Sequence, residues 1–243
     1  MSPWLLRRPG PGRTRRLICF DCAGGNALPF LPWQERVDPT LEICAVQLPG
    51  RGARMAEPPP GSMRELVRAL AAVVAPLTDQ PFAFLGHSLG ALIAFELARL
   101  CRLQYIPTPQ HLFVAGCGGP RQRERLGLHL LPDEQLSDAL RTYNGTPPEL
   151  LEHHALMAAV LPAIRADFCM VDDYEYRASL PLTAPITVLA GRADPHVSAD
   201  QAEGWRAETT SDCRVAWFDG DHFFLHPSRD AVIRCIDQRW PAA

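Results

Sequence analysis

The chain of 243 residues suits one α/β domain with an inserted segment, and its 47% hydrophobic and 21% charged residues are typical of a globular protein. A formal net charge of −3 gives no sign of a nucleic-acid-binding protein. All 24 residues of the Lys+Arg count are arginines, which excludes a lysine Schiff base or a phosphate-binding P-loop. No secretory signal and no run of ~18 apolar residues is visible, so we expect a cytoplasmic protein without a membrane segment.

Strands and helices are expected to alternate after an arginine-rich start. Residues 1–16 hold five arginines and are predicted to form a flexible N-terminal tail. A helix is expected to begin at Ser62, because Ser62 and Glu65 fit a capping box. Apolar runs predict strands over residues 17–20, 41–46, 82–85, 111–115, 186–190 and 214–218. Further helices are predicted over about 89–101, 199–208 and 229–238. This order predicts an α/β protein with a mostly parallel central sheet and helices on both faces.

Residues 121–180 interrupt the alternation, because they contain helical stretches and no convincing strand. We expect them to form a helical lid above the carboxyl ends of the strands, inserted between core segments 17–120 and 181–243. Several apolar residues there either line a channel or pack the lid onto the sheet, and packing is the preferred interpretation for each. These residues are Leu126, Leu128, Leu130, Leu136, Leu156 and Met157.

The sequence Gly-His-Ser-Leu-Gly at residues 86–90 lies between a predicted strand and a predicted helix. This context is that of the nucleophile elbow of the α/β-hydrolase fold, with Ser88 as the nucleophile at the amino end of the helix. Gly86 and Gly90 are expected where a side chain would collide with neighbouring backbone. The pattern therefore predicts a serine hydrolase, the alternative being a loop with a surface serine.

A serine hydroxyl needs a base to remove its proton, and the base needs a third group to orient it. In this fold the acid and the histidine follow late strands, in that order after the serine. Asp194 follows the strand predicted at 186–190, and His222 follows the last strand. We therefore predict Ser88, Asp194 and His222 as the catalytic residues. The other acids and histidines considered fit less well, namely His87, His153, His154, Asp172, Asp173, Asp219, Asp221 and His226.

An oxyanion hole needs two backbone N–H groups. We assign these to Leu89, which follows the nucleophile, and to Ala23 in the Ala-Gly-Gly turn after the first core strand. Cys19 and Cys22 have the spacing of a redox or zinc motif, but no second pair accompanies them. We expect reduced thiols, no metal and no cofactor.

Several motifs together resemble the type II thioesterases, free-standing editing enzymes of polyketide and nonribosomal peptide synthesis. The resemblance extends over about residues 17–240. Its carriers are Cys-Ala-Gly-Gly at 22–25, Gln-Leu-Pro-Gly-Arg at 47–51, Gly-His-Ser-Leu-Gly-Ala at 86–91, Gly-Arg-Ala-Asp-Pro at 191–195 and Gly-Asp-His-Phe-Phe at 220–224. The most specific matches lie in the insertion, at 144–147, 161–168 and 174–176.

The resemblance implies a function as well as a fold. By it, Ser88, Asp194 and His222 are the triad, and Ala23 and Leu89 the oxyanion donors. The implied substrate is an acyl group on the phosphopantetheine arm of an acyl or peptidyl carrier protein, hydrolysed by a monomer.

One departure is visible. Asp21 and Cys22 stand where the family usually has Pro and then an aromatic residue or His, which affects the Ala23 assignment. Two alternatives stay open, an esterase or lipase acting on soluble esters and a catalytically inactive binding module.

Overall fold

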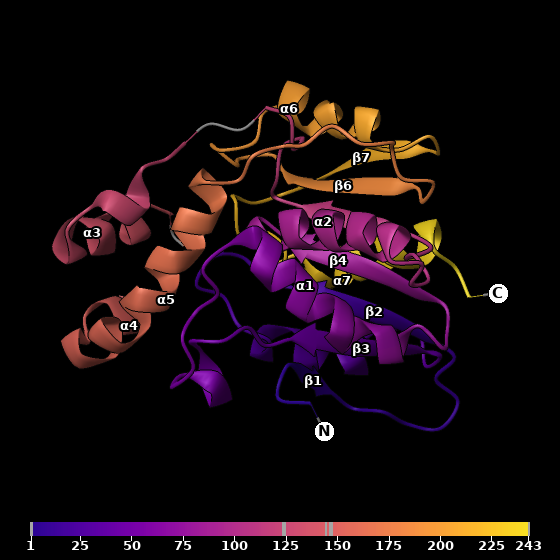
Figure 1. Ribbon diagram of the computed structural model, residues 1–243, viewed down its shortest axis with the longest axis horizontal. Coiled ribbons are helices and arrows are strands. Elements are labelled where there is room, and N and C mark those ends of the chain that lie inside the picture. Colours follow the sequence, from indigo (N-terminus) through magenta and orange to yellow (C-terminus); the bar gives the residue numbers. More distant parts are fainter. Residues whose placement is uncertain (1, 123–124, 144, 146–147, 243) are drawn as a thin grey trace.

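A seven-stranded sheet forms the centre of the computed structural model, which describes residues 2–122, 125–143, 145 and 148–242 (Figure 1). The strands are β1 (Leu5–Arg7), β2 (Arg15–Phe20), β3 (Leu41–Val46), β4 (Phe82–His87), β5 (Leu112–Ala115), β6 (Ile186–Gly191) and β7 (Cys213–Phe218). Their order is β1-β3-β2-β4-β5-β6-β7, with β1 antiparallel to β3 and the remaining neighbours parallel. The predicted mostly parallel sheet is confirmed.

Helices cover both faces of this sheet. They are α1 (Met63–Val74) and α2 (Leu89–Leu103) on one face, and α7 (Arg229–Arg239) with a 3-10 helix (Leu28–Glu35) on the other (Figure 1). Residues of β2 alternate between the two cores: Ile18 and Phe20 pack with the first, and Leu17 and Cys19 with the second. Burial on both faces explains why the strand is an unbroken apolar run rather than an alternating one.

The helix starts follow the predicted chemistry in part. Ser62 caps α1 by accepting the Glu65 N–H at 3.2 Å, but the Glu65 carboxylate accepts the N–H of Gly61 at 3.1 Å, so the predicted capping box is only half formed. A complete capping box at Ser198 and Gln201, which the sequence analysis missed, begins α6 (Ala199–Glu203). A 3-10 helix (Gly204–Glu208) then completes the helix predicted at 199–208.

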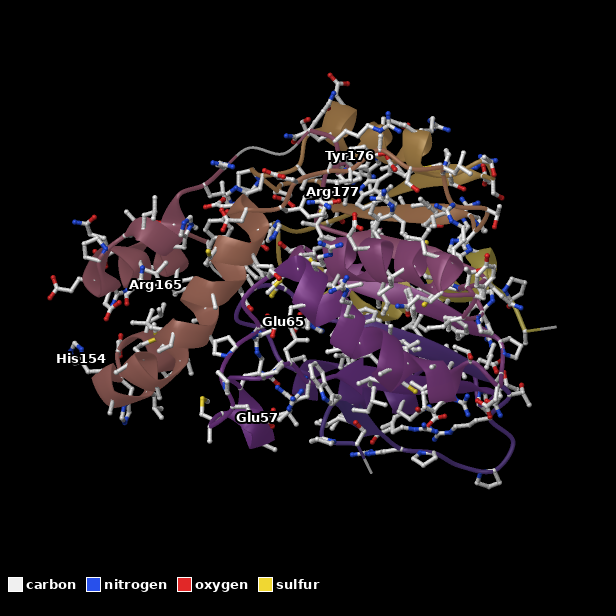
Figure 2. All side chains as sticks on the ribbon, in the orientation of Figure 1. Glu57, Glu65, His154, Arg165, Tyr176 and Arg177 are labelled. Carbon is white, nitrogen blue, oxygen red and sulfur yellow. The ribbon has the colours of Figure 1, made fainter. Side chains whose placement is uncertain are left out.

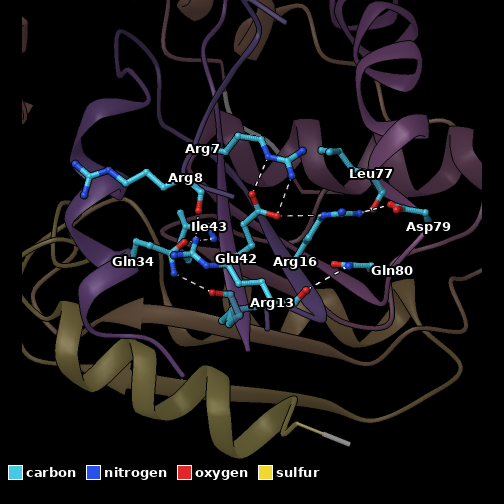
Figure 3. Close-up of polar contacts among 11 residues, drawn as sticks. Arg7, Arg8, Arg13, Arg16, Gln34, Glu42, Ile43, Leu77, Asp79 and Gln80 are labelled. Carbon is cyan, nitrogen blue, oxygen red and sulfur yellow. Dashed lines mark hydrogen bonds and ion pairs between the residues drawn. The ribbon is translucent and has the colours of Figure 1, made fainter. Parts of the chain in front are cut away.

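The first 16 residues do not form the predicted flexible tail. Strand β1 pairs with β3, and Arg15 and Arg16 begin β2, where both are buried. The physical reason is Glu42 on β3, a buried carboxylate that accepts two hydrogen bonds from Arg7, at 2.7 and 3.0 Å, and one from Arg16, at 3.3 Å (Figure 3). Arg7 and Arg16, which were expected to be solvated, therefore supply the hydrogen bonds of a buried carboxylate.

The segment between β5 and β6 is helical in its described part. It contains a 3-10 helix (Leu128–Leu130), α3 (Asp133–Tyr143), α4 (Pro148–Leu151) and α5 (His154–Asp172), gathered beyond one end of the sheet (Figure 1). A separate apolar cluster holds these helices together, formed by Leu136, Leu140, Leu151, Met157, Leu161, Ile164 and Phe168. Arg165 on α5 ties them further, because it donates to the Leu131 carbonyl and pairs with Asp133, both at 2.6 Å (Figure 2).

Helix α5 is long and apolar enough, by length and composition, to cross a membrane, with a mean hydropathy of 1.4. It is the one such helix among the described residues, and the sequence analysis had expected none. Its Leu161, Ile164 and Phe168 are buried within the protein, and Asp167 is fully buried. Internal helices of globular proteins meet the same criteria, so the composition of α5 gives little reason to assign a membrane segment.

Candidate active site

The turn at Ser88 has the backbone of a nucleophile elbow. Ser88 lies directly before α2 with φ 53° and ψ −113°, a conformation that costs strain in a residue other than glycine. A Cβ on Gly86 would lie 2.1 Å from the carbonyl oxygen of Gly90, and one on Gly90 would lie 2.2 Å from that of Phe20. Both glycines are therefore required by close backbone approach, as predicted.

His222 and Asp194 meet at the carboxyl ends of β7 and β6. The Nδ1 atom of His222 lies 2.9 Å from Oδ2 of Asp194, and both side chains are buried. Ser88 and His222 line the same cavity. The three side chains predicted from chain order thus lie at one place in the fold. Asp194 is hydrogen-bonded to His222, and Ser88 and His222 line the same cavity.

Hydrogen bonds fix both the backbone of His222 and its partner Asp194. The Nε2 atom of His87 lies 2.8 Å from the His222 carbonyl oxygen, and the other carboxylate oxygen of Asp194 accepts the N–H of His196 at 2.8 Å. Burial lowers the pKa of His222, and the charges of His87 and His196 lower it further, although the hydrogen bond that His222 donates to Asp194 acts in the opposite direction. A lowered pKa keeps this imidazole neutral, as a general base must be, at neutral pH.

Burial would raise the pKa of Asp194, but its hydrogen bond to His222 and the N–H of His196 more than offset this, so that the pKa lies below its usual value. The carboxylate is therefore ionised wherever His222 is neutral. An ionised acceptor on Nδ1 fixes the tautomer that leaves Nε2 free to accept a proton.

Two backbone N–H groups are available for an oxyanion. Leu89 is the first residue of α2, so its N–H has no acceptor within the helix. Ala23 lines the cavity, and its N–H has no acceptor among the residues that the structure describes. These are the two groups that the sequence analysis assigned to the oxyanion hole.

Asp21, the departure from the family pattern, orders the loop that carries Ala23. Its carboxylate accepts the N–H groups of Cys22 at 2.9 Å and Asn26 at 3.1 Å. Burial would raise the pKa of Asp21, but the imidazoles of His226 and His87, which lie 3.9 and 3.8 Å from its Oδ1, lower it well below its usual value. The substitution thus places an ionised acceptor under the loop and leaves Ala23 at the cavity.

Asp21, Cys22 and His87 also form the group that comes nearest to a metal site among the described residues, with ligand atoms within 4.8 Å of one another. Burial raises the pKa of the Cys22 thiol well above its usual value, and the neighbouring Asp21 charge raises it further. Metal binding requires the thiolate, so these surroundings disfavour it. Cys19, the other cysteine of the Cys-x-x-Cys spacing, is buried in the second core, away from this group.

The cavity has a volume of about 430 Å³ and lies between the sheet and the inserted helices. The insertion contributes Gln122, Leu126, Tyr143, Phe168 and Val171 to its wall. Of the six apolar residues considered for a channel, Leu126 lines this cavity, whereas Leu136 and Met157 are buried in the cluster of the insertion and Leu130 and Leu156 are exposed. Leu128 packs against this cluster as well, so packing was the correct interpretation for three of the six residues.

Sequence reasoning missed Tyr143 and His196. Their rings stack with centroids 4.2 Å apart, and the His196 ring meets His222 edge-on at 5.4 Å. The position of His196, two residues after Asp194, was a usable signal, whereas nothing local pointed to Tyr143. Of the predicted motif at 144–147, residues 144, 146 and 147 lie outside the described residues.

Comparison with known proteins assigns the family. A model of the thioesterase domain family matches residues 15–240. The chain belongs to this family. GrsT, a gramicidin S biosynthesis protein of Aneurinibacillus migulanus, is 42% identical over 219 residues, which are 90% of this thioesterase and 86% of GrsT. Thioesterase PikA5 of Streptomyces venezuelae is 35% identical over 225 residues, 92% of this chain and 80% of PikA5.

A solved structure agrees with these relatives. The type II thioesterase BorB from the borrelidin biosynthetic cluster superimposes with a TM-score of 0.89 at 37% identity, covering 97% of each chain. The predicted resemblance to type II thioesterases and the predicted α/β-hydrolase fold are confirmed, and the chain is an enzyme, a thioesterase of the serine hydrolase fold.

Proposed function

We propose that this thioesterase hydrolyses acyl thioesters on the phosphopantetheine arm of acyl or peptidyl carrier proteins, as an editing enzyme of polyketide or nonribosomal peptide synthesis. The observation that carries the proposal is the position of Ser88 and His222 on one cavity, with Asp194 bonded to His222. The names of the relatives support the kind of pathway, because GrsT is named for gramicidin S biosynthesis and BorB for the borrelidin biosynthetic cluster. The carrier-bound thioester is what the resemblance to type II thioesterases implies. We also infer that it acts as a monomer in the cytoplasm, where such synthases work.

The mechanism is acyl transfer in two steps. Ser88 Oγ attacks the thioester carbonyl carbon while His222 Nε2 takes the hydroxyl proton and Asp194 stabilises the imidazolium. The N–H groups of Ala23 and Leu89 stabilise the tetrahedral oxyanion. The carbon–sulfur bond then breaks, and the thiol leaves with the proton from His222. In the second step His222 deprotonates a water molecule that attacks the acyl-serine, which releases the carboxylic acid and free Ser88.

The test is a panel of acyl-loaded carrier proteins, each analysed by mass spectrometry before and after exposure to the enzyme. We expect unloaded carrier from the wild type and a loss of several orders of magnitude in rate for Ser88→Ala. Near-normal turnover by Ser88→Ala would refute the assignment of the nucleophile.

Two controls separate the alternatives. Equal rates on an acyl carrier thioester and on a matched simple oxygen ester would favour a general esterase. A fluorophosphonate probe should label Ser88 in the wild type. An inactive binding module would not react with it.

A further inference from the structure

Helix α5 is bound directly to the loop that supplies Ala23. The carboxylate of Asp167 on α5 is fully buried and accepts the N–H of Gly24 at 2.8 Å. Arg51 lies on the loop after β3, and both of its terminal nitrogens donate hydrogen bonds to this carboxylate, at 2.7 and 2.9 Å. One of these nitrogens also donates to the carbonyl oxygen of Gly25 at 3.2 Å. One buried ion pair thus joins the insertion, the β3 loop and the oxyanion loop.

Two glycines at this junction leave no space for a side chain between the loops and α5. Gly24 has φ +72°, and a Cβ there would lie 2.9 Å from Cγ1 of Ile164 on α5. Gly50 has φ +80°, and a Cβ there would lie 3.1 Å from the Cβ of Ala163. Consecutive residues of α5 therefore rest on the two glycine turns with no room for another methyl group.

The acceptor on Gly24 controls the direction of the neighbouring N–H. The Ala23 N–H belongs to the peptide between Cys22 and Ala23. Asp167 fixes the following peptide through the Gly24 N–H, and Asp21 fixes the preceding one through the Cys22 N–H. The planar peptide between these two anchors can then only rotate about the line that joins its Cα atoms, and steric contacts of the backbone limit that rotation. The Ala23 N–H lies between two N–H groups that are each bound to a buried carboxylate.

We propose that Asp167 and Arg51 are positioning residues that hold the Ala23 N–H in the oxyanion hole, so that the hole is complete only when α5 is seated on the core. The inference rests on the proposed function, since it concerns the same site. Helix α5 also contributes Phe168 and Val171 to the cavity wall. A substrate that displaces α5 thereby disturbs the oxyanion hole, whereas one that fits beneath it does not.

The alternative is a purely structural ion pair, and the chain offers a matched control for it. Glu42 is an equally buried carboxylate, held by Arg7 and Arg16 away from the site (Figure 3). Asp167→Asn and Glu42→Gln each neutralise a buried acid. Arg51 and Arg7 then lose their counter-charge, whereas Arg16 keeps its ion pair with Asp79. Both substitutions should lower the free energy of unfolding, but only Asp167→Asn should alter catalysis.

We expect Asp167→Asn to lower kcat about 10- to 100-fold with little change in KM, somewhat less than complete removal of an oxyanion donor costs. Glu42→Gln should keep kcat within about twofold of the wild type, since it lies outside the site. Equal losses of kcat in the two variants would overturn the proposal.

A second variant remains informative if Asp167→Asn does not fold. Arg51→Met with Asp167→Leu replaces the ion pair by apolar groups of similar size, a change that buried pairs often tolerate without loss of stability. The Gly24 N–H still loses its acceptor, so we expect near-normal unfolding but a lowered kcat and a parallel loss of affinity for an acyl trifluoromethyl ketone, which mimics the tetrahedral intermediate. A normal kcat in this double variant would overturn the proposal.

Arg165→Ala supplies a control for loosening of the insertion, because Arg165 ties α5 to α3 without contact to the oxyanion loop. A kcat loss equal to that of the double variant would show that seating of the helices alone matters and would overturn the role of Asp167. The rate of Ser88 labelling by a fluorophosphonate, measured in the same variants, does not depend on the natural substrate. A wild type that labels Ser88 but hydrolyses no carrier thioester would therefore refute the proposed function while the labelling rates still test the positioning role.

Discussion

His222 is an imidazole on which neighbouring groups act in opposite directions. Burial and the charges of His87 and His196 favour its neutral form, whereas the Asp194 carboxylate favours the protonated form. Burial and the two histidine charges prevail, so the pKa of His222 lies below the ordinary value of 6.5. His87 and His196 therefore influence His222 in a way that chain order did not suggest, because His87 was considered only as a possible base and His196 was not considered.

This balance predicts a pH dependence. In the proposed mechanism the neutral imidazole is the base, so kcat/KM should rise with pH through the lowered pKa of His222 and reach a plateau before pH 7. His196→Gln removes a group that lowers the pKa, so the midpoint of the rise should move upward. The measurement is kcat/KM for an acyl thioester between about pH 4 and pH 8. A midpoint above 6.5 in the wild type, or a downward shift in the variant, would contradict this assignment.

At the scale of a single element, α1 shows how far a local motif determines a helix start. Ser62 accepts the Glu65 N–H as the motif predicts, yet the Glu65 carboxylate turns to the N–H of Gly61 instead of that of Ser62. Both contacts are exposed. Water can take the place of the Glu65 carboxylate at the Gly61 N–H. Without the Ser62 hydroxyl, the N–H of Glu65 in the first turn loses an acceptor that the helix itself cannot supply.

Ser62→Ala should therefore lower the free energy of unfolding by about 1 kcal/mol, the usual cost of removing a serine cap. Glu65→Ala should cost less, about 0.5 kcal/mol or below, because its partner lies outside the helix. Urea denaturation of both variants provides the measurement. The reverse order of the two losses would mean that the carboxylate, and not the hydroxyl, stabilises the start of α1.

At the scale of the whole molecule, the N-terminal strand completes the sheet and its charges. β1 covers the edge of β3, and Arg7 supplies two of the hydrogen bonds that Glu42 accepts (Figure 3). Trp4 adds a further contact, since the Arg54 guanidinium lies 3.8 Å from its ring centre. These contacts join the first residues to two separate parts of the core.

Removal of residues 1–9 should consequently lower the free energy of unfolding by roughly 2–3 kcal/mol, because Glu42 stays buried with fewer partners. Arg8→Ala is the matched control, since the pair between Arg8 and Glu35 is exposed and should contribute under about 1 kcal/mol. Thermal or urea unfolding decides between these outcomes. A truncated protein as stable as the wild type would restore the interpretation of this segment as a free tail.

The sequence by itself determined what depends on neighbours along the chain. Unbroken apolar runs located the parallel strands, because burial on both faces removes polar residues locally. The glycines around Ser88 marked the elbow, because their spacing between a strand and a helix is itself the signal. The crowding at Gly86 comes from the nearby Gly90, whereas the crowding at Gly90 comes from Phe20 on β2 and is tertiary. Chain order then placed Asp194 and His222 after their strands.

Only the tertiary structure decided the contacts between distant segments. Arg51 and Asp167 are 116 positions apart, and although both lie in motifs that carry the family resemblance, no local pattern shows that they pair. The same holds for Arg7 with Glu42, which turned an expected tail into a strand, and for Tyr143 beside His196. The periodicity of the sequence indicates whether a residue is buried. It does not indicate the partner of a buried charge, because that partner can come from any segment that packs against it once the chain has folded.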